Sequence, residues 1–236
     1  MRLFQHSQSS SWNHTCWFPD PHDDYGEWTN KDDLISMAHV RLSIIDTSKA
    51  ASQPMISNSG RFIITYNGEL YNYLEIKNKL INKGSKFKTK GDTEVLLEYI
   101  EKEGFGALSK LNGIFSFALW DRKTKSLTLC RDSMGVKPLY FYSKNNKLIF
   151  SSELKSILRS NLISLKINKK AILRHLGFLW SPGEETIASD IKKVLPGEVI
   201  QISRNLKINK FIFKDIKFSL NKELNIQNLP SLLSTK

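Results

Sequence analysis

The chain has 236 residues and a formal net charge of +12, from 35 Lys and Arg against 23 Asp and Glu. Hydrophobic residues make up 40% of it, which suffices for a sizeable core and excludes wholesale disorder. Two cysteines are too few for a disulfide framework or a structural zinc site, so no metal is expected.

The chain shows no sign of a membrane span or of a secretory leader. No stretch reaches the roughly 18 apolar residues that a membrane span requires. The first residues lack the apolar core of a signal peptide. We therefore expect a cytoplasmic protein with no membrane partner.

The positive charge is spread over lysines that are spaced by Asn, Ile and Leu. There is no arginine-rich run and no aromatic-flanked basic motif. This pattern is typical of a solvated surface rather than of a nucleic-acid site. We therefore expect no nucleic-acid partner.

Three zones follow one another along the chain. Residues 1–22 are polar without periodicity, which predicts an irregular arm. Residues 23–203 alternate strand and helix signals and predict one compact domain. Residues 204–236 are rich in Lys, Asn and Leu and predict a tail, or the stub of a further region.

Two strands are predicted in the first part of the domain. Residues 36–45 alternate apolar and polar side chains, and residues 61–66 form a second apolar run. Asn67 and Gly68 follow at once. Because both residues tolerate positive φ, they predict a tight turn.

Two helices follow. Apolar residues at helical spacing predict one helix over 71–82, which Gly84 would end. A second helix is predicted over 92–102, with Asp92 as its N-cap.

The second half of the domain is dominated by strands. Strands are predicted over 114–120, 126–131, 138–142, 147–151 and 198–202, and helices over 153–159 and 168–179. Asn145 and Asn146 predict a hairpin between two of these strands. Hairpin-joined strands with grouped helices favour an α+β fold with antiparallel sheets.

A series of ordered sequence blocks runs along the predicted domain. The blocks are 39–46 (HVRLSIID), 53–55 (QPM), 66–72 (YNGELYN), 91–96 (GDTEVL), 113–121 (GIFSFALWD), 131–140 (RDSMGVKPLY), 150–155 (FSSELK) and 195–197 (LPG). Together they resemble the glutaminase domain of glutamine-hydrolysing asparagine synthetases. Because their order and spacing also match, the set is far more specific than any one block.

That family is a class II glutamine amidotransferase of the N-terminal-nucleophile (Ntn) hydrolase type. The resemblance therefore implies a four-layer α/β/β/α sandwich of antiparallel sheets. It also implies that glutamine is bound and hydrolysed, and that the ammonia feeds a C-terminal synthetase domain that activates aspartate with ATP. The sequence has no Ser-Gly-Gly-x-Asp-Ser pyrophosphate loop and no Walker motif. ATP and Mg are thus expected only in a separate synthetase domain or chain, no cofactor is expected in this domain, and a homodimer is left open.

The resemblance assigns the residues that hold glutamine. Arg41 would clamp the α-carboxylate, since a guanidinium can place two hydrogen bonds on it. Asp92 would pair with the α-ammonium, and Glu69 would support that pairing. The residues by themselves also allow an internal ion pair for Arg41 and a helix cap for Asp92.

The resemblance also assigns an oxyanion hole, whose donors must be in place before the reaction. The Asn67 side-chain amide and the Gly68 backbone N–H match it. Backbone groups of Leu42, Ser43, Ile44 and Ile45 would line the substrate amide. The 131–140 block carries no catalytic role, and we expect it to be structural, with Asp132 and Lys137 fixing its loop.

The nucleophile is where the resemblance breaks. The family uses a cysteine that follows the initiator Met and acts with its own free α-amine. Position 2 is Arg2, Cys16 is internal, and Cys130 ends an apolar strand where a structural role is expected. The likeness begins abruptly at Asp23, which a frameshift, a mis-set start or loss of the first strand would each explain. We expect a domain cut at both ends that binds glutamine more than it turns it over.

The predicted function is the ammonia-supplying half of a glutamine-dependent asparagine synthetase. One alternative is a catalytically inactive module that binds glutamine or a partner chain. Another is an amidotransferase half that serves sugar or peptide amidation.

Overall fold

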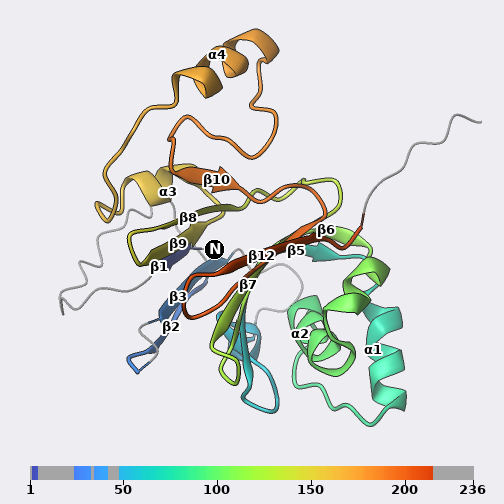
Figure 1. Ribbon diagram of the computed structural model, residues 1–236. Helices are drawn as coiled ribbons and strands as arrows, with labels where there is room; N and C mark the ends of the chain where they lie inside the picture. Colours follow the sequence, from blue (N-terminus) through green and yellow to red (C-terminus); the bar gives the residue numbers. More distant parts are fainter. Residues whose placement is uncertain (1, 5–23, 33–34, 42–47, 215–236) are drawn as a thin grey trace, which may run out of the picture.

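Figure 1 shows the fold as a computed structural model, which describes residues 2–4, 24–32, 35–41 and 48–214. The predictions for Leu42, Ser43, Ile44, Ile45 and Cys16 lie outside these described residues. The same holds for most of the two end zones.

Two six-stranded sheets make up the centre of the molecule, and all their strand pairs are antiparallel. The first sheet has the order β10-β8-β9-β1-β3-β2. Its strands are β1 (Arg2–Phe4), β2 (Asp24–Asn30), β3 (Ile35–Arg41), β8 (Tyr140–Lys144), β9 (Lys147–Ser151) and β10 (Ile191–Lys193). The second has the order β12-β11-β7-β6-β5-β4. Its strands are β4 (Met55–Ile56), β5 (Phe62–Leu70), β6 (Gly113–Asp121), β7 (Ser126–Arg131), β11 (Glu198–Ile202) and β12 (Ile208–Ile212).

Four α-helices accompany the sheets in the described part of the chain. They are α1 (Tyr73–Asn82), α2 (Asp92–Glu103), α3 (Leu154–Leu158) and α4 (Lys169–Phe178), with short 3-10 turns at Lys49–Ala51 and Phe105–Lys110. Within the described ranges, every helix falls short of the length and apolar character needed to cross a bilayer.

Three buried clusters define four layers. One cluster, which includes Leu96 and Phe117, lies between the helices α1 and α2 and the second sheet. Another, which includes Met37 and Ile63, fills the space between the two sheets. A third joins α3, through Ile157, to the outer face of the first sheet. This arrangement confirms the predicted α/β/β/α sandwich of antiparallel sheets.

Both ends of the described chain contribute strands that the sequence patterns did not indicate. Residues 2–4 form β1 in the middle of the first sheet, where Arg2 pairs with Ala38 of β3 and with Ser151 of β9. They are therefore not part of an irregular arm. At the other end, β12 pairs with β11 along its whole length. The second sheet thus runs past the boundary expected at residue 203.

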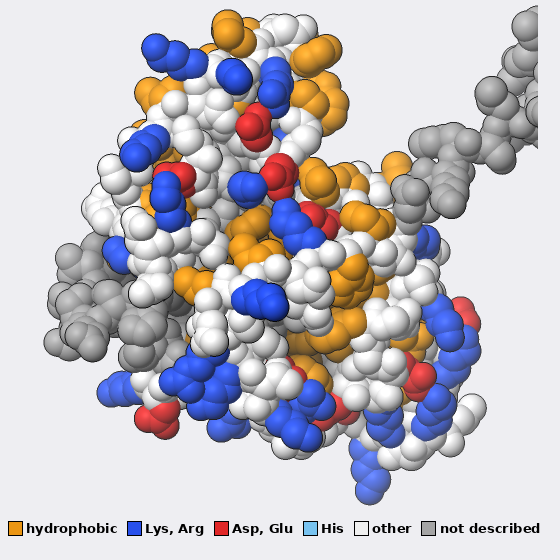
Figure 2. All heavy atoms as spheres, viewed as in Figure 1, with side chains coloured by type: hydrophobic (Ala, Val, Ile, Leu, Met, Phe, Trp, Pro, Cys, Tyr) orange, Lys and Arg blue, Asp and Glu red, His pale blue; other side chains and the backbone are white. Residues whose placement is uncertain are grey.

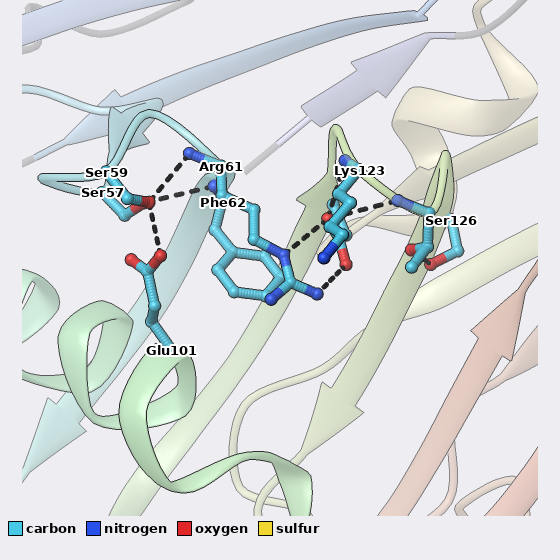
Figure 3. A network of polar contacts seen from close by, with 9 residues as sticks. Ser57, Ser59, Arg61, Phe62, Glu101, Lys123 and Ser126 are labelled. Atoms are coloured by element: carbon cyan, nitrogen blue, oxygen red, sulfur yellow. Dashed lines mark hydrogen bonds and ion pairs between the residues drawn. The ribbon is translucent and has the colours of Figure 1, made fainter.

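The start of β5 is fixed by a polar network (Figure 3). The Arg61 guanidinium donates two hydrogen bonds to Asp121 of β6, from Nε to Oδ1 at 3.0 Å and from Nη2 to Oδ2 at 2.7 Å. The Ser59 hydroxyl donates to the Glu101 carboxylate of α2. These contacts hold one end of β5 against both its neighbouring strand and the helix layer, so that the far end of β5 has a defined position.

Candidate functional site

The Asn67-Gly68-Glu69 motif lies in the second half of β5. Here the predicted turn is wrong, because β5 runs unbroken and pairs with β6, with Asn67 opposite Ser116 and Gly68 opposite Phe115. The hairpin predicted at 145–146 is confirmed, since both asparagines have φ of 53° between β8 and β9.

Gly68 is required by close approach of two strands. A Cβ at this position would lie 2.1 Å from the Ile114 carbonyl oxygen and 2.5 Å from the Phe115 Cα. A Cβ at Gly113, on the facing strand, would lie 2.3 Å from the Glu69 carbonyl oxygen. Only glycine permits such an approach between backbones. Gly68 is therefore needed for the close packing of β5 against β6, and not for a turn of the chain.

This packing predicts a large effect for Gly68→Ala. We expect the variant to lose about 3 kcal/mol or more of unfolding free energy, because the new methyl group meets backbone that cannot move aside. Gly106→Ala is the matched control, since a Cβ there has no atom within 4 Å. It should change stability by less than about 0.5 kcal/mol. Urea denaturation followed by circular dichroism measures both, and equal losses would contradict the steric explanation.

The alternation of side chains along β5 sets the direction of Asn67. Ile63 belongs to the core between the sheets, whereas Ile64 and Tyr66 belong to the core on the helix side. Because successive side chains point to opposite faces, Asn67 lies on the inter-sheet side. It is partly exposed, and within the described ranges its side-chain amide has no hydrogen-bond partner. The role of this amide in an oxyanion hole stays a prediction.

Asp92 connects the start of α2 to the end of β5. Its Oδ2 accepts hydrogen bonds from the Tyr66 hydroxyl and the Leu70 backbone N–H, both at 2.9 Å. The N-cap of α2 is Gly91, so the prediction that Asp92 caps the helix is wrong. The carboxylate is turned toward the neighbouring strand, whose buried donors it satisfies instead of those of its own helix.

The two carboxylates near this junction make it electronegative. Asp92 is 6% exposed, and burial raises its pKa. The hydrogen bonds from Leu70 and Tyr66 lower that pKa, while the charge of Glu69 raises it further. Burial and the adjacent Asp92 also raise the pKa of the Tyr66 hydroxyl. In the described part of the chain neither Asp92 nor Glu69 has an ion pair with lysine or arginine, so a bound cation would relieve the repulsion.

Two residues of the site region had no role in the sequence analysis. Gln53 accepts a hydrogen bond from the Tyr66 backbone N–H at 2.6 Å, and its amide donates to the Thr93 hydroxyl at 3.4 Å. It therefore links β5 to the first turn of α2. Tyr66 could have been found from strand alternation, which turns it toward the helices. The contacts of Gln53 join segments far apart in the sequence and leave no local signal.

Arg41 is the last residue of β3, where it pairs with Asp24. The strand β3 packs against β5 across the space between the sheets. Because β1 is antiparallel to β3 and Arg2 pairs with Ala38, the start of β1 lies toward the Arg41 end of β3. The start of β1 and the end of β3 therefore lie at the same end of the first sheet. The role of Arg41 as a clamp for the carboxylate stays a prediction.

The loop after β7 is structural, as predicted. Asp132 is fully buried, and its carboxylate accepts from the backbone N–H groups of Phe115, Met134, Val136 and Lys137. The Arg131 guanidinium donates to the backbone carbonyls of Gly135, Lys137 and Val194. Lys137 takes part through its backbone rather than through its ammonium group.

Cys130 is buried within β7 and is 0% exposed. Burial raises the pKa of its thiol well above the usual value. A thiolate is therefore strongly disfavoured there, which agrees with the predicted structural role.

Residues 21–212 match the glutamine amidotransferase domain family. The chain belongs to this family. The finding confirms the resemblance drawn from the sequence blocks, and class II glutamine amidotransferases are enzymes. The junction of β5 and α2 described above is thus the part of an amidotransferase domain that carries the matched motifs.

Two curated relatives are asparagine synthetases by name. The amidotransferase domain is 36% identical over 171 residues to asparagine synthetase [glutamine-hydrolyzing] 1 of Bacillus subtilis, which covers 72% of this chain and 27% of the relative. It is 42% identical over 167 residues to putative asparagine synthetase [glutamine-hydrolyzing] 2 of Methanocaldococcus jannaschii, which covers 63% of this chain and 32% of the relative. The chain thus spans about a third or less of these relatives.

A solved structure shares the fold. The glutamine phosphoribosylpyrophosphate amidotransferase from B. subtilis, complexed with ADP and GMP, matches the amidotransferase domain with a TM-score of 0.55 at 23% identity. The match covers 77% of this chain and 35% of that chain. It supports the four-layer α/β/β/α sandwich.

Proposed function

We propose that this chain is the glutamine-binding, ammonia-supplying half of a glutamine-dependent asparagine synthetase. The observation that carries the proposal is the junction of β5 and α2, where Asp92 and Glu69 lie beside the Asn67-Gly68 motif. An ammonium group would neutralise the paired carboxylates, and the Asn67 amide has a hydrogen bond to offer. Glutamine presents an α-ammonium and a side-chain amide, the two groups that such a site would recognise.

The remaining roles follow from this orientation of the ligand. Arg41 would hold the α-carboxylate, and the backbone of residues 42–45 would line the side-chain amide. During hydrolysis the carbonyl oxygen of that amide gains negative charge, which the Asn67 amide and the Gly68 N–H would stabilise. The α-ammonium would be held by Asp92, with Glu69 beside it. No cofactor is needed for these steps, and ATP and Mg would belong to the synthetase half.

Hydrolysis also requires a nucleophile that attacks the amide carbon and expels ammonia, followed by attack of water on the acyl intermediate. Cys130 cannot serve, because it is buried and its thiol pKa is raised. A second candidate function is that the domain binds glutamine and does not turn it over.

The ammonia would be used for ATP-dependent amidation of aspartate by a synthetase half. The names of the B. subtilis and M. jannaschii relatives support this acceptor over a sugar or a peptide. The synthetase half would be a covalently linked domain or a separate chain. A homodimer would be compatible with either arrangement, and the expected location is the cytoplasm.

Titration calorimetry with glutamine tests the proposal. We expect saturable binding, and binding of asparagine about tenfold weaker or more, since its side chain is one methylene shorter. Absence of saturable glutamine binding would overturn the proposal. Ammonia release from the same protein, measured before and after a thiol reagent, separates the two candidates. Release that the reagent abolishes indicates an enzyme, and binding without release indicates a binding module.

A further inference from the structure

The loop between β7 and β8 exposes two apolar side chains. Met134 is 65% exposed and Val136 is 52% exposed. They flank Gly135, where a Cβ would lie 2.7 Å from the Pro196 Cγ. The loop belongs to the 131–140 block, which has no role in the glutamine site. The exposure of its apolar residues therefore needs an explanation of its own.

Two more exposed apolar side chains extend this surface. Pro196, between β10 and β11, is exposed. Ile212 of β12 is 53% exposed, and its Cγ2 lies 3.7 Å from the Cβ position of Gly197, the residue after Pro196. We call Met134, Val136, Pro196 and Ile212 the loop patch. Figure 2 shows hydrophobic side chains on the surface next to the point where the described chain ends.

Hydrogen bonds hold the loop patch in one conformation. The buried Asp132 carboxylate accepts from four backbone N–H groups, among them those of Met134 and Val136. The Gly197 N–H donates to the Asp132 carbonyl oxygen at 2.9 Å, which ties the Pro196 segment to the same loop. A surface that is fixed in advance loses little conformational entropy when a partner covers it. Exposed apolar side chains on such a surface are therefore suited to docking.

The described chain ends beside the loop patch. The Phe213 N–H donates to the Gly197 carbonyl oxygen at 2.9 Å. The carbonyl oxygen of Lys214, the last described residue of β12 and its extension, lies 2.2 Å from the Cβ position of Gly197. The Lys214 ammonium group donates to the Leu111 carbonyl oxygen at 3.3 Å. A polypeptide that continues past Lys214, as in relatives about three times longer, would start within reach of the loop patch.

The small size of the loop patch favours a linked partner over a second copy of this chain. A stable interface between free chains buries roughly 1,000 Å² or more. Four partly exposed side chains supply only a part of this area. Covalent linkage raises the local concentration of a partner to about the millimolar range, so that a smaller contact suffices.

We propose that the loop patch is the docking surface for the synthetase half, which would cover it with apolar side chains. The identity of this partner rests on the proposed function. The exposed side chains, the fixed loop and the position of the chain end are observations independent of the glutamine site.

A chimera tests the proposal, with this chain joined ahead of the synthetase portion of the M. jannaschii relative. Oxidation of Met134 to the sulfoxide by hydrogen peroxide is followed by peptide mass spectrometry in the chimera and in this chain alone. Met37 and Met55, which are 1% and 7% exposed, are internal controls and should oxidise slowly in both. We expect Met134 to oxidise at least tenfold more slowly in the chimera, because the synthetase half would cover its thioether.

Asparagine formation from added ammonia shows that the synthetase half of the chimera is folded. Equal oxidation of Met134 with and without a synthetase half that forms asparagine would overturn the proposal. If the first chimera is inactive, a second one with the synthetase portion of the B. subtilis relative supplies the same measurement.

Other occupants of the loop patch are detected in this chain alone. Oxidation of Met134 as slow as that of Met37 would overturn the proposal, because the patch would already be covered. A rate that then rises on dilution would identify a second copy of the chain as the cover. A rate independent of concentration would identify residues 215–236 instead.

Matched variants locate the contact. Val136→Lys places an ammonium group in the loop patch, so Met134 in the chimera should oxidise within twofold of its rate in the chain alone. Ammonia-dependent synthesis should be unchanged. Leu74→Lys, on α1 and 59% exposed, is the control and should keep Met134 protected. If Leu74→Lys removes the protection equally, the loop patch is not the contact.

Glutamine titration of the same chimera separates this interface from the proposed function. Absence of glutamine binding with Met134 protected would count against the glutamine site and not against the interface. Saturable glutamine binding with Met134 unprotected would count against the interface alone.

Discussion

Asp132→Ala should lower the unfolding free energy of the chain by about 3–5 kcal/mol. The side chain is fully buried, and its two oxygens accept four backbone N–H groups. Alanine would leave these donors buried without partners, and each unpaired donor costs about 1–3 kcal/mol before relaxation. Urea denaturation at pH 7 measures the loss.

Asp190→Ala is the matched control for Asp132. Asp190 forms one surface ion pair, with Lys144 at 2.9 Å. Its removal should cost less than about 1 kcal/mol. Similar losses for the two variants would show that the donors around Asp132 find water or new partners. The loop between β7 and β8 would then not depend on this carboxylate.

Asp92→Asn should weaken glutamine binding about 30- to 150-fold. The change removes the charge that would pair with the α-ammonium, and a hydrogen bond to a charged group contributes about 2–3 kcal/mol. The asparagine carbonyl can still accept from Tyr66 and Leu70, so the junction of β5 and α2 should persist. Titration calorimetry with glutamine measures the change.

Glu98→Gln is the control for Asp92. Glu98 is also a buried carboxyl of α2 whose pKa burial raises, but its partner is the backbone N–H of Asn58, at 2.8 Å. The affinity of the Glu98→Gln variant for glutamine should stay within threefold of the affinity of the unmodified chain. Equal weakening by both variants would point to a general effect of charge on α2.

The same Asp92→Asn variant has a predicted pH dependence of stability. Because the folded pKa of Asp92 is raised, the folded state binds a proton more tightly than the unfolded chain does. Its contribution to stability is complete below the unfolded pKa of about 4 and is lost as the pH rises through the folded value. The unmodified chain should therefore lose stability relative to Asp92→Asn across that window.

Much of the fold was predictable because its signals are local. The apolar run and its ends predicted β11 over 198–202 as it is found, and helical spacing predicted α2 to within one residue. The Asn145-Asn146 hairpin follows from two residues that accept positive φ. In each case the residues that carry the signal lie within the element itself.

The failures involve partners that are distant in the sequence. Asn67-Gly68 looks like a turn locally, but nine residues of β6 offer β5 a continuous pairing edge. The strand β12 is exposed along most of its length and lacks an alternating pattern, so only its pairing with β11 defines it. Aspartate is a residue type that favours the N-cap position, yet the carboxylate of Asp92 accepts from the Tyr66 hydroxyl and the Leu70 backbone N–H instead.

The site was predictable only as a set of residues. The motif blocks indicated Asn67, Gly68, Glu69 and Asp92 together, and the structure places them at one junction. The residues that hold the junction in place, Gln53 and Tyr66, could not be assigned a role from sequence. Their contacts depend on the packing of α2 against β5.

The long, unbroken pairing of β5 with β6 carries a consequence for how such a chain can vary over evolutionary time. Register runs without interruption from Phe62 opposite Asp121 to Leu70 opposite Gly113. A deletion or insertion of one codon before Asn67 would exchange the two faces of every later residue. The amide of Asn67 would then turn toward the helices. Gly68 would no longer lie where the backbones of β5 and β6 approach most closely, so a residue with a Cβ would take its place there. Substitutions along this strand can accumulate gradually, whereas a change of length by one residue is expected to remove the site in a single step.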